Sequence, residues 1–187
     1  TRAVLGDTTV IPYNDAEALE RVLRDGDVAC FIVEPVMENI GICKPQPGYL
    51  EAVREITRRY GTLLIFDEVK TGITAGWGGA TGAVGVTPDL ATFGKGMANG
   101  YSVSALVGRR DIMELGGIRH DKPRVFLTST THGAENHCLA AARAALKRNF
   151  TCSPQATNSS RHSRPWARAR ALAGQASDQA RTQASVK

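Results

Sequence analysis

The 187-residue sequence predicts an α/β fold: a mainly parallel sheet with flanking helices. Short, continuous apolar runs alternate with helix-like segments between about residue 28 and residue 150. Runs of this kind are typical of strands buried on both faces, and each one ends at an acidic residue or a glycine. Alternating strands and helices favour parallel pairing, because a parallel pair needs a long crossover connection.

The first predicted elements are two strands with a helix between them. Residues 28–33 form a strand that we expect to be buried on both faces. Residues 49–60 form a helix, because their apolar side chains recur at helical spacing and a glycine follows. Residues 62–66 form the second strand, and Asp67 and Glu68 come directly after it.

The later elements continue the alternation. A glycine-rich stretch over residues 72–85 precedes a third strand, residues 88–93, which leads into Gly94-Lys95-Gly96. The remaining predicted elements are a strand, a helical turn and an Ala-rich helix, over residues 102–107, 110–115 and 134–148.

The charge distribution divides the chain into two parts. Residues 1–150 carry 17 Lys and Arg against 17 Asp and Glu, so this part has no electrostatic footprint for nucleic acid. Residues 151–187 carry six basic side chains against Asp178 alone, with few large apolar residues. We expect this basic, low-complexity tail to be disordered or a non-native end. A basic arm that binds polyanions is the alternative.

Nothing in the sequence suggests a membrane or secreted protein. No run approaches the ~18 apolar residues of a membrane span, and the first residues lack the apolar stretch of a signal peptide. The four cysteines show no C-x-x-C spacing. We therefore expect a cytoplasmic protein with reduced thiols and no membrane partner.

Two charged residues lie where a ligand of such a fold would bind, beyond the carboxyl ends of the strands. Asp67 follows five apolar residues, and a carboxylate there is costly to bury unless it has a partner. Lys95 lies between two glycines, whose backbone can approach a ligand closely. A turn or helix-cap carboxylate and a solvated loop lysine are the plain alternatives.

Commoner motifs are missing from the sequence. The residues around Lys95 do not match the phosphate-binding loop, and the glycine-rich stretch does not match the dinucleotide fingerprint. The four histidines form no H-E-x-x-H motif, and no serine has the context of a nucleophile elbow. The sequence therefore predicts no metal site and no hydrolase.

Five short motifs follow one another along the chain: Leu64-Ile65-Phe66-Asp67-Glu68-Val69, Thr71-Gly72, Gly85-Val86-Thr87-Pro88-Asp89-Leu90, Gly94-Lys95-Gly96 and Gly108-Arg109-Arg110. This ordered series resembles the class III aminotransferases, which use pyridoxal 5'-phosphate. Within that family it looks most like the glutamate-1-semialdehyde 2,1-aminomutases. The resemblance extends from about Glu34 to Leu146 and implies a partial large domain of the fold-type-I transferase fold over residues 1–150.

The resemblance implies a role for four residues. Lys95 would bond covalently to the cofactor aldehyde and then move a proton during catalysis. Asp67 would pair with the pyridine nitrogen and keep it protonated. Val69 would pack against one face of the ring, although a plain core valine is equally compatible with the sequence. Thr130 would bind the cofactor phosphate of the neighbouring subunit; Thr131 competes for this role, and an N-cap is the alternative.

The implied activity is transfer of an amino group between an amino acid and a carbonyl compound, in a homodimer of the full-length protein. The intramolecular aminomutase reaction of tetrapyrrole synthesis is one alternative. Residues 97–101 differ from the glycine-rich sequence expected of an aminomutase, which favours an aminotransferase. Residues 1–27 supply no phosphate-binding loop, so we also consider a weakly binding or inactive remnant that acts only through subunit association.

Overall fold

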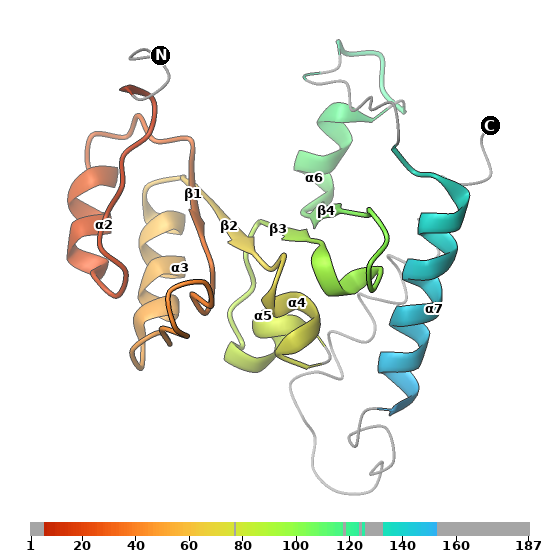
Figure 1. Cartoon of the computed structure of the whole chain (residues 1–187). Helices are drawn as coiled ribbons and strands as arrows, with labels where there is room; N and C mark the ends of the chain where they lie inside the picture. The colour runs from red at the N-terminus through yellow and green to blue at the C-terminus, as the bar shows by residue number, and fades with distance from the viewer. Residues whose placement is uncertain (1–5, 77, 118, 124, 126–132, 153–187) are drawn as a thin grey trace, which may run out of the picture.

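The computed structural model describes residues 6–76, 78–117, 119–123, 125 and 133–152. Its centre is a four-stranded sheet with the order β1-β2-β3-β4 (Figure 1). The strands β1, β2 and β3 are parallel and β4 is antiparallel to β3, which confirms the predicted mainly parallel sheet. The strands span Cys30–Val33, Leu63–Asp67, Leu90–Phe93 and Ala105–Gly108.

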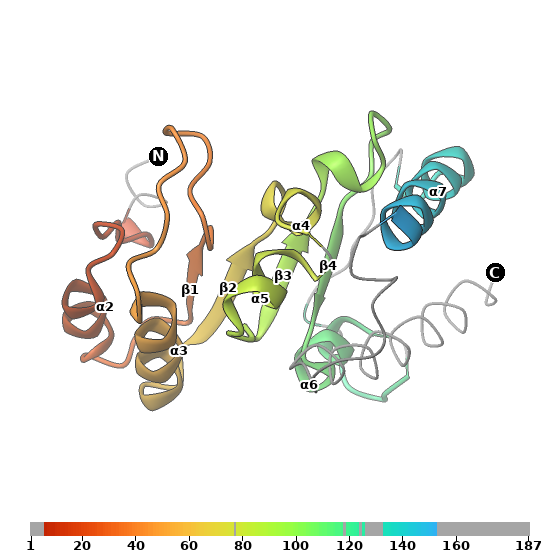
Figure 2. The same cartoon turned by 90° about the horizontal axis from the view of Figure 1, so that it is seen from below.

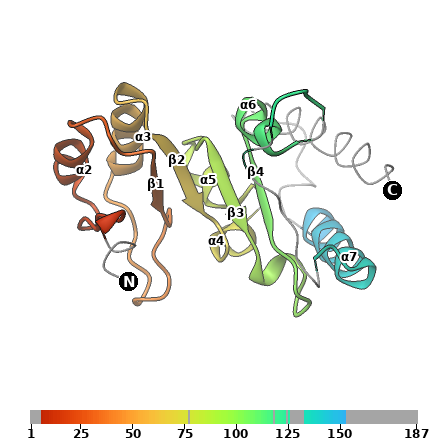
Figure 3. The same ribbon diagram turned by 90° about the horizontal axis from the view of Figure 1, so that it is seen from above.

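The helices α2 and α3 lie at the β1 end of the sheet, and α6 and α7 lie at the β4 end (Figures 2 and 3). Short helices follow β2, and two 3-10 turns, η1 and η2, follow β3 and α6. The helices α2 to α7 and the two turns span, in chain order, Ala16–Leu23, Tyr49–Arg59, Thr71–Thr74, Gly79–Val84, Lys95–Met97 (η1), Arg110–Met113, Glu114–Gly116 (η2) and Asn136–Cys152. No described helix is both long and apolar enough to span a membrane.

Local signals explain where the first helices begin. The Asp15 carboxylate accepts a hydrogen bond from the Ala18 backbone N–H at 2.8 Å and so caps α2, a helix that we did not predict. Gly48 precedes α3 with φ of 83°, a conformation that glycine adopts at little cost. The last helix, α7, begins at Asn136 and continues to Cys152, whereas we expected a helix over residues 134–148.

The hydrophobic core lies on one face of the sheet. The helices α2 and α3 contribute their buried side chains to it, and the strands contribute every second residue. In β2 the alternation is regular, because Leu64, Phe66 and the following Glu68 are all buried. The chain itself covers this face over β1, β2 and β3, whereas Val107 of β4, opposite Ala91, is 47% exposed.

The opposite face of the sheet is open over much of its area. On β1, Cys30 is exposed and Ile32 is 58% exposed, so the prediction of a first strand buried on both faces was wrong. On β4, Leu106 is 44% exposed. One side of β1 thus faces the core, and the other side is largely exposed among the described residues.

One buried carboxylate ties the sheet to its surroundings. Asp89 is 5% exposed and accepts hydrogen bonds from the Leu64 backbone N–H at 2.8 Å and from the Arg54 guanidinium at 2.9 Å. Its second oxygen accepts from Arg109 at 3.0 Å. Burial alone would raise the pKa of Asp89, but these hydrogen bonds outweigh it and hold the pKa below its ordinary value. The ionised side chain of Asp89 therefore links α3, β2 and the residue that follows β4.

The antiparallel strand β4 approaches the backbone of Asp89 and Leu90 so closely that position 108 needs a glycine. A Cβ atom on Gly108 would lie 2.3 Å from the Asp89 carbonyl oxygen and 2.9 Å from the Leu90 Cα. The backbone N–H of Arg109 donates to the same carbonyl at 2.9 Å. The segment Gly108-Arg109 is thus fixed against β3 by both backbone and side chain.

We expect Asp89→Asn to lower the free energy of unfolding by about 3 kcal/mol, because it leaves the mostly buried Arg54 without its charge partner. The matched control is Glu55→Gln, which removes an exposed ion pair from the same helix and should cost less than about 1 kcal/mol. Urea unfolding at neutral pH measures both. Equal losses in the two variants would contradict the role given to Asp89.

The same residue predicts a pH dependence. Because the pKa of Asp89 is lower in the folded chain than its unfolded value of about 3.9, the unfolded state binds more protons as the pH falls through this range. The stabilisation is complete above the unfolded pKa and is lost below it. The difference in unfolding free energy between wild type and Asp89→Asn should therefore shrink on acidification below about pH 4. A constant difference would contradict the depressed pKa.

Candidate functional site

Asp67 is the last residue of β2 and lies on the open face of the sheet. The parallel register sets it opposite Thr92 of β3. One carboxylate oxygen, Oδ1, accepts hydrogen bonds from the Val69 backbone N–H at 2.9 Å and from the Thr92 hydroxyl at 3.4 Å. The other oxygen, Oδ2, has no hydrogen-bond partner among the described residues. Asp67 is therefore oriented through one oxygen, and the other remains available to a ligand.

Val69 lies two residues beyond Asp67 and is half-buried. It lies against the loop that follows β3, since a Cβ atom on Gly94 would meet its Cγ1 at 3.4 Å. Gly94 itself is buried. The absence of a side chain at Gly94 thus lets the end of β3 approach the side chain of Val69.

Lys95 follows Gly94 and begins the turn η1. Its backbone φ is 42°, in the left-handed region that residues with a side chain rarely adopt. The side chain is exposed, and its amine forms no ion pair with any described residue. By contrast, the nearby Lys70 is paired with Glu38 at 3.9 Å and donates to the Asn39 side chain at 3.1 Å.

The fold therefore brings three of the four predicted site residues to one place. Asp67 ends β2, Val69 follows it by two residues, and Lys95 lies two residues after the end of the neighbouring parallel strand β3. This is the edge at which open α/β sheets bind their ligands. The fourth, Thr130, lies outside the described residues, and its role stays a prediction.

Glu68 was not among the predicted site residues, and its buried side chain holds the segments next to Asp67 in place. Its side chain is 1% exposed. It accepts hydrogen bonds from the Thr71 hydroxyl at 2.8 Å, the Ala80 N–H at 2.8 Å, and the Thr81 N–H and hydroxyl at 2.7 and 2.6 Å. Glu68 thus fixes the first turns of α4 and α5 to the end of β2. The alternation with Leu64 and Phe66 is the signal that could have identified it as buried.

The other elements at this edge are also closely packed. A Cβ atom on Gly72 of α4 would lie 2.4 Å from the Phe93 ring, so α4 rests directly on the end of β3. Ile73, also in α4, lies against the turn η1, since a Cβ atom on Gly96 would be 3.5 Å from the Ile73 side chain. The strand ends that hold Asp67 and Lys95 are therefore held together through α4.

Comparison with known proteins gives the family. The sequence profile of the family described as Aminotransferase class-III matches residues 1–162, which is most of the chain. The chain belongs to this family. The family resemblance carried by the motifs around Asp67 and Lys95 is thereby confirmed.

Individual relatives of this class III aminotransferase chain support the same family assignment. A glutamate-1-semialdehyde 2,1-aminomutase from Desulfotalea psychrophila is 47% identical over 146 residues, which cover 77% of this chain and 33% of the relative. Among solved structures, a glutamate-1-semialdehyde-aminomutase (K286A) from Pseudomonas aeruginosa PAO1 in complex with PMP has a TM-score of 0.64 and 34% identity, covering 73% of this chain and 31% of that chain. An ornithine aminotransferase from Plasmodium yoelii has a TM-score of 0.67 and 31% identity, covering 75% and 36%.

The chain spans between about a quarter and a third of the length of the curated relatives it matches. The structural neighbours place it in the fold of the pyridoxal-phosphate-dependent aminotransferases, as part of a domain. The expected fold class is therefore confirmed. The division at residue 150 stays a prediction, because residues 153–187 lie outside the described residues.

Two glycines provide a test of how Glu68 supports the site. Gly79 and Gly85 have similar backbone conformations, with φ of 63° and 74°, so an alanine strains each by about 1 kcal/mol. At Gly79 a Cβ atom would also lie 2.6 Å from Glu68 Oε2, whereas at Gly85 it would meet open space. We expect Gly79→Ala to lower the free energy of unfolding by about 2 kcal/mol more than Gly85→Ala. Equal effects in urea unfolding would contradict the role of Glu68.

Proposed function

We propose that residues 67–95 hold pyridoxal 5'-phosphate in the full-length protein. The observation that carries the proposal is the juxtaposition of a carboxylate, a valine and an exposed amine at neighbouring strand ends. The chemistry of these groups fits the cofactor. Asp67 offers an oxygen to a protonated ring nitrogen, Val69 offers an apolar surface to the ring, and Lys95 offers an amine to the aldehyde.

In this proposal the chain's own hydrogen bonds prepare Asp67 for its role. The Val69 N–H and the Thr92 hydroxyl both donate to Oδ1, which holds the carboxylate in one orientation. Oδ2 would then hold a proton at the pyridine nitrogen. A protonated ring accepts electrons from the substrate carbon, and this is the chemistry that the cofactor supplies when bound.

Lys95 would bind the cofactor covalently and then act as a base and an acid. Its side chain is exposed, and the preceding residue, Gly94, lies against the Val69 side chain, which supports a position of Lys95 near the proposed ring. The free Lys95 amine would also take up and return the proton of the substrate carbon, acting first as a base and then as an acid. Thr130 would bind the phosphate of the neighbouring subunit's cofactor, as the family resemblance implies.

We propose amino-group transfer between an amino acid and a carbonyl compound as the reaction. The aminomutase reaction, in which donor and acceptor carbons belong to the same molecule, is the second candidate. It is favoured by the names of relatives at 47–55% identity, which are glutamate-1-semialdehyde 2,1-aminomutases. Conversion of glutamate-1-semialdehyde by the full-length protein, without any added amino donor or carbonyl acceptor, would separate the aminomutase from a transaminase.

We also propose an oligomeric state and a cellular location for the full-length protein. We infer a homodimer of the full-length protein, and the open sheet face with Ile32 and Leu106 supports burial against further protein. We place the protein in the cytoplasm, a location supported by free cysteines at Cys30, Cys43 and Cys138. The same open face also supports the alternative of a remnant that acts only by associating with another subunit.

Borohydride reduction after addition of pyridoxal phosphate, followed by peptide mapping, tests the cofactor site in this chain. We expect the label to concentrate on Lys95, because the other lysine at this edge, Lys70, is held by Glu38 and Asn39. Lys95→Ala should remove most of the bound cofactor, and the matched control Lys70→Ala should not. Label scattered over all lysines without preference would contradict the proposed site and favour the association role.

A further inference from the structure

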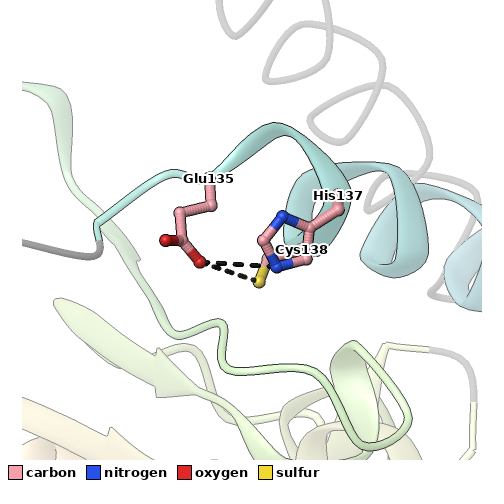
Figure 4. A group of neighbouring side chains, drawn as sticks. All are labelled: Glu135, His137 and Cys138. Atoms are coloured by element: carbon pink, nitrogen blue, oxygen red, sulfur yellow. Dashed lines mark hydrogen bonds and ion pairs between the residues drawn. The ribbon is translucent and has the colours of Figure 1, made fainter.

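A second group of chemically active side chains lies at the start of α7, away from Asp67 and outside the proposed catalytic role. Figure 4 shows Glu135, just before the helix, turned towards His137 and Cys138 in its first turn. The Glu135 Oε2 atom lies 3.4 Å from His137 Nε2 and 3.8 Å from Cys138 Sγ. All three potential ligand atoms lie within 4.8 Å of one another. We propose that Glu135, His137 and Cys138 bind a divalent cation of the Zn²⁺ type.

The two separations from Glu135 are close to those of a tetrahedral zinc site, and the third, between His137 and Cys138, is within 4.8 Å. Zinc bonds of ~2.0–2.3 Å at tetrahedral angles place a nitrogen and an oxygen ligand about 3.4 Å apart, and a sulfur and an oxygen ligand about 3.5 Å apart. The observed 3.4 and 3.8 Å are therefore close to the distances that a bound ion requires.

The chemical types of the three ligands favour zinc over magnesium and calcium. A thiolate and an imidazole favour zinc and similar borderline-soft ions, whereas magnesium and calcium prefer sites made of oxygen atoms. Binding would release the thiol proton of Cys138, and that of His137 if its ring is protonated. The thiolate and the Glu135 carboxylate then balance the two charges of the cation. Three protein ligands leave a fourth position for water or another small ligand.

The surroundings hold two of the ligands in place. Cys138 is 3% exposed, so its sulfur is fixed on the buried side of α7. The ring of Tyr101 lies edge-on to His137, with 6.0 Å between ring centroids, and orients the imidazole from outside. Tyr101 belongs to the loop after η1, and α7 contacts η1 itself. All three ligands come from residues 135–138, so a bound ion would fix the conformation of the chain at the start of α7, beside η1.

Cobalt, which occupies zinc sites and reports its ligands by absorption, tests the proposal. The full 187-residue chain, purified without a polyhistidine tag, is titrated with Co²⁺ and then with Zn²⁺ as competitor. We expect a thiolate-to-cobalt charge-transfer band that Zn²⁺ abolishes. Cys138→Ser should remove the band, and His137→Ala, which changes an exposed side chain, should weaken Zn²⁺ binding by more than about tenfold.

A control variant distinguishes metal binding at Cys138 from metal binding at the other cysteines. A variant with Cys30, Cys43 and Cys152 all changed to Ser retains Cys138 and should keep both the band and the affinity. Loss of the band in this variant, or equal Zn²⁺ affinity in wild type and His137→Ala, would overturn the proposal. Neither result depends on pyridoxal phosphate, so the metal site and the cofactor site succeed or fail separately.

Discussion

The parallel register of β2 and β3 is the constraint on which the rest of the site depends. Pairing of Asp67 with Thr92 places the ends of the two strands side by side. It also sets which face each side chain takes, because a slip of one residue would exchange the two faces. With this register, Asp67 and Val69 share the open face, and the loop from Phe93 to Lys95 begins beside them. The packing of α4 against both strand ends preserves this arrangement.

Two adjacent carboxylates consequently have opposite roles. Asp67 keeps one oxygen for a ligand, whereas Glu68 uses both oxygens within the protein and accepts four hydrogen bonds. A buried carboxylate is tolerated only when its hydrogen bonds are satisfied. Glu68 meets this condition by binding the starts of two short helices. The backbone alternation of a strand is thus enough to make one acid structural and its neighbour available for chemistry.

Much of this arrangement could be predicted from the sequence, because the strand signals are local. The strand signals identified all four strands of the described residues, and the motifs around Asp67 and Lys95 indicated the family. Burial of β1 could not be predicted correctly, because an apolar run does not reveal whether the chain covers both faces. The role of Glu68 depends on Thr81, thirteen residues away, and hydrogen bonds at such distances leave no periodic pattern. The cluster at Glu135, His137 and Cys138 matched no common metal motif, since the turn before α7 creates it.

The central claim is that Asp67 holds a proton on the ring nitrogen of a cofactor bound at Lys95. The chemical shift of that nitrogen, measured by NMR with ¹⁵N-labelled pyridoxal phosphate, tests it most directly. We expect a protonated nitrogen in the wild-type chain at neutral pH and an unprotonated one in Asp67→Asn, which keeps the shape of the side chain but loses its charge. A nitrogen that is unprotonated in the wild type, or equally protonated in both, would contradict the account.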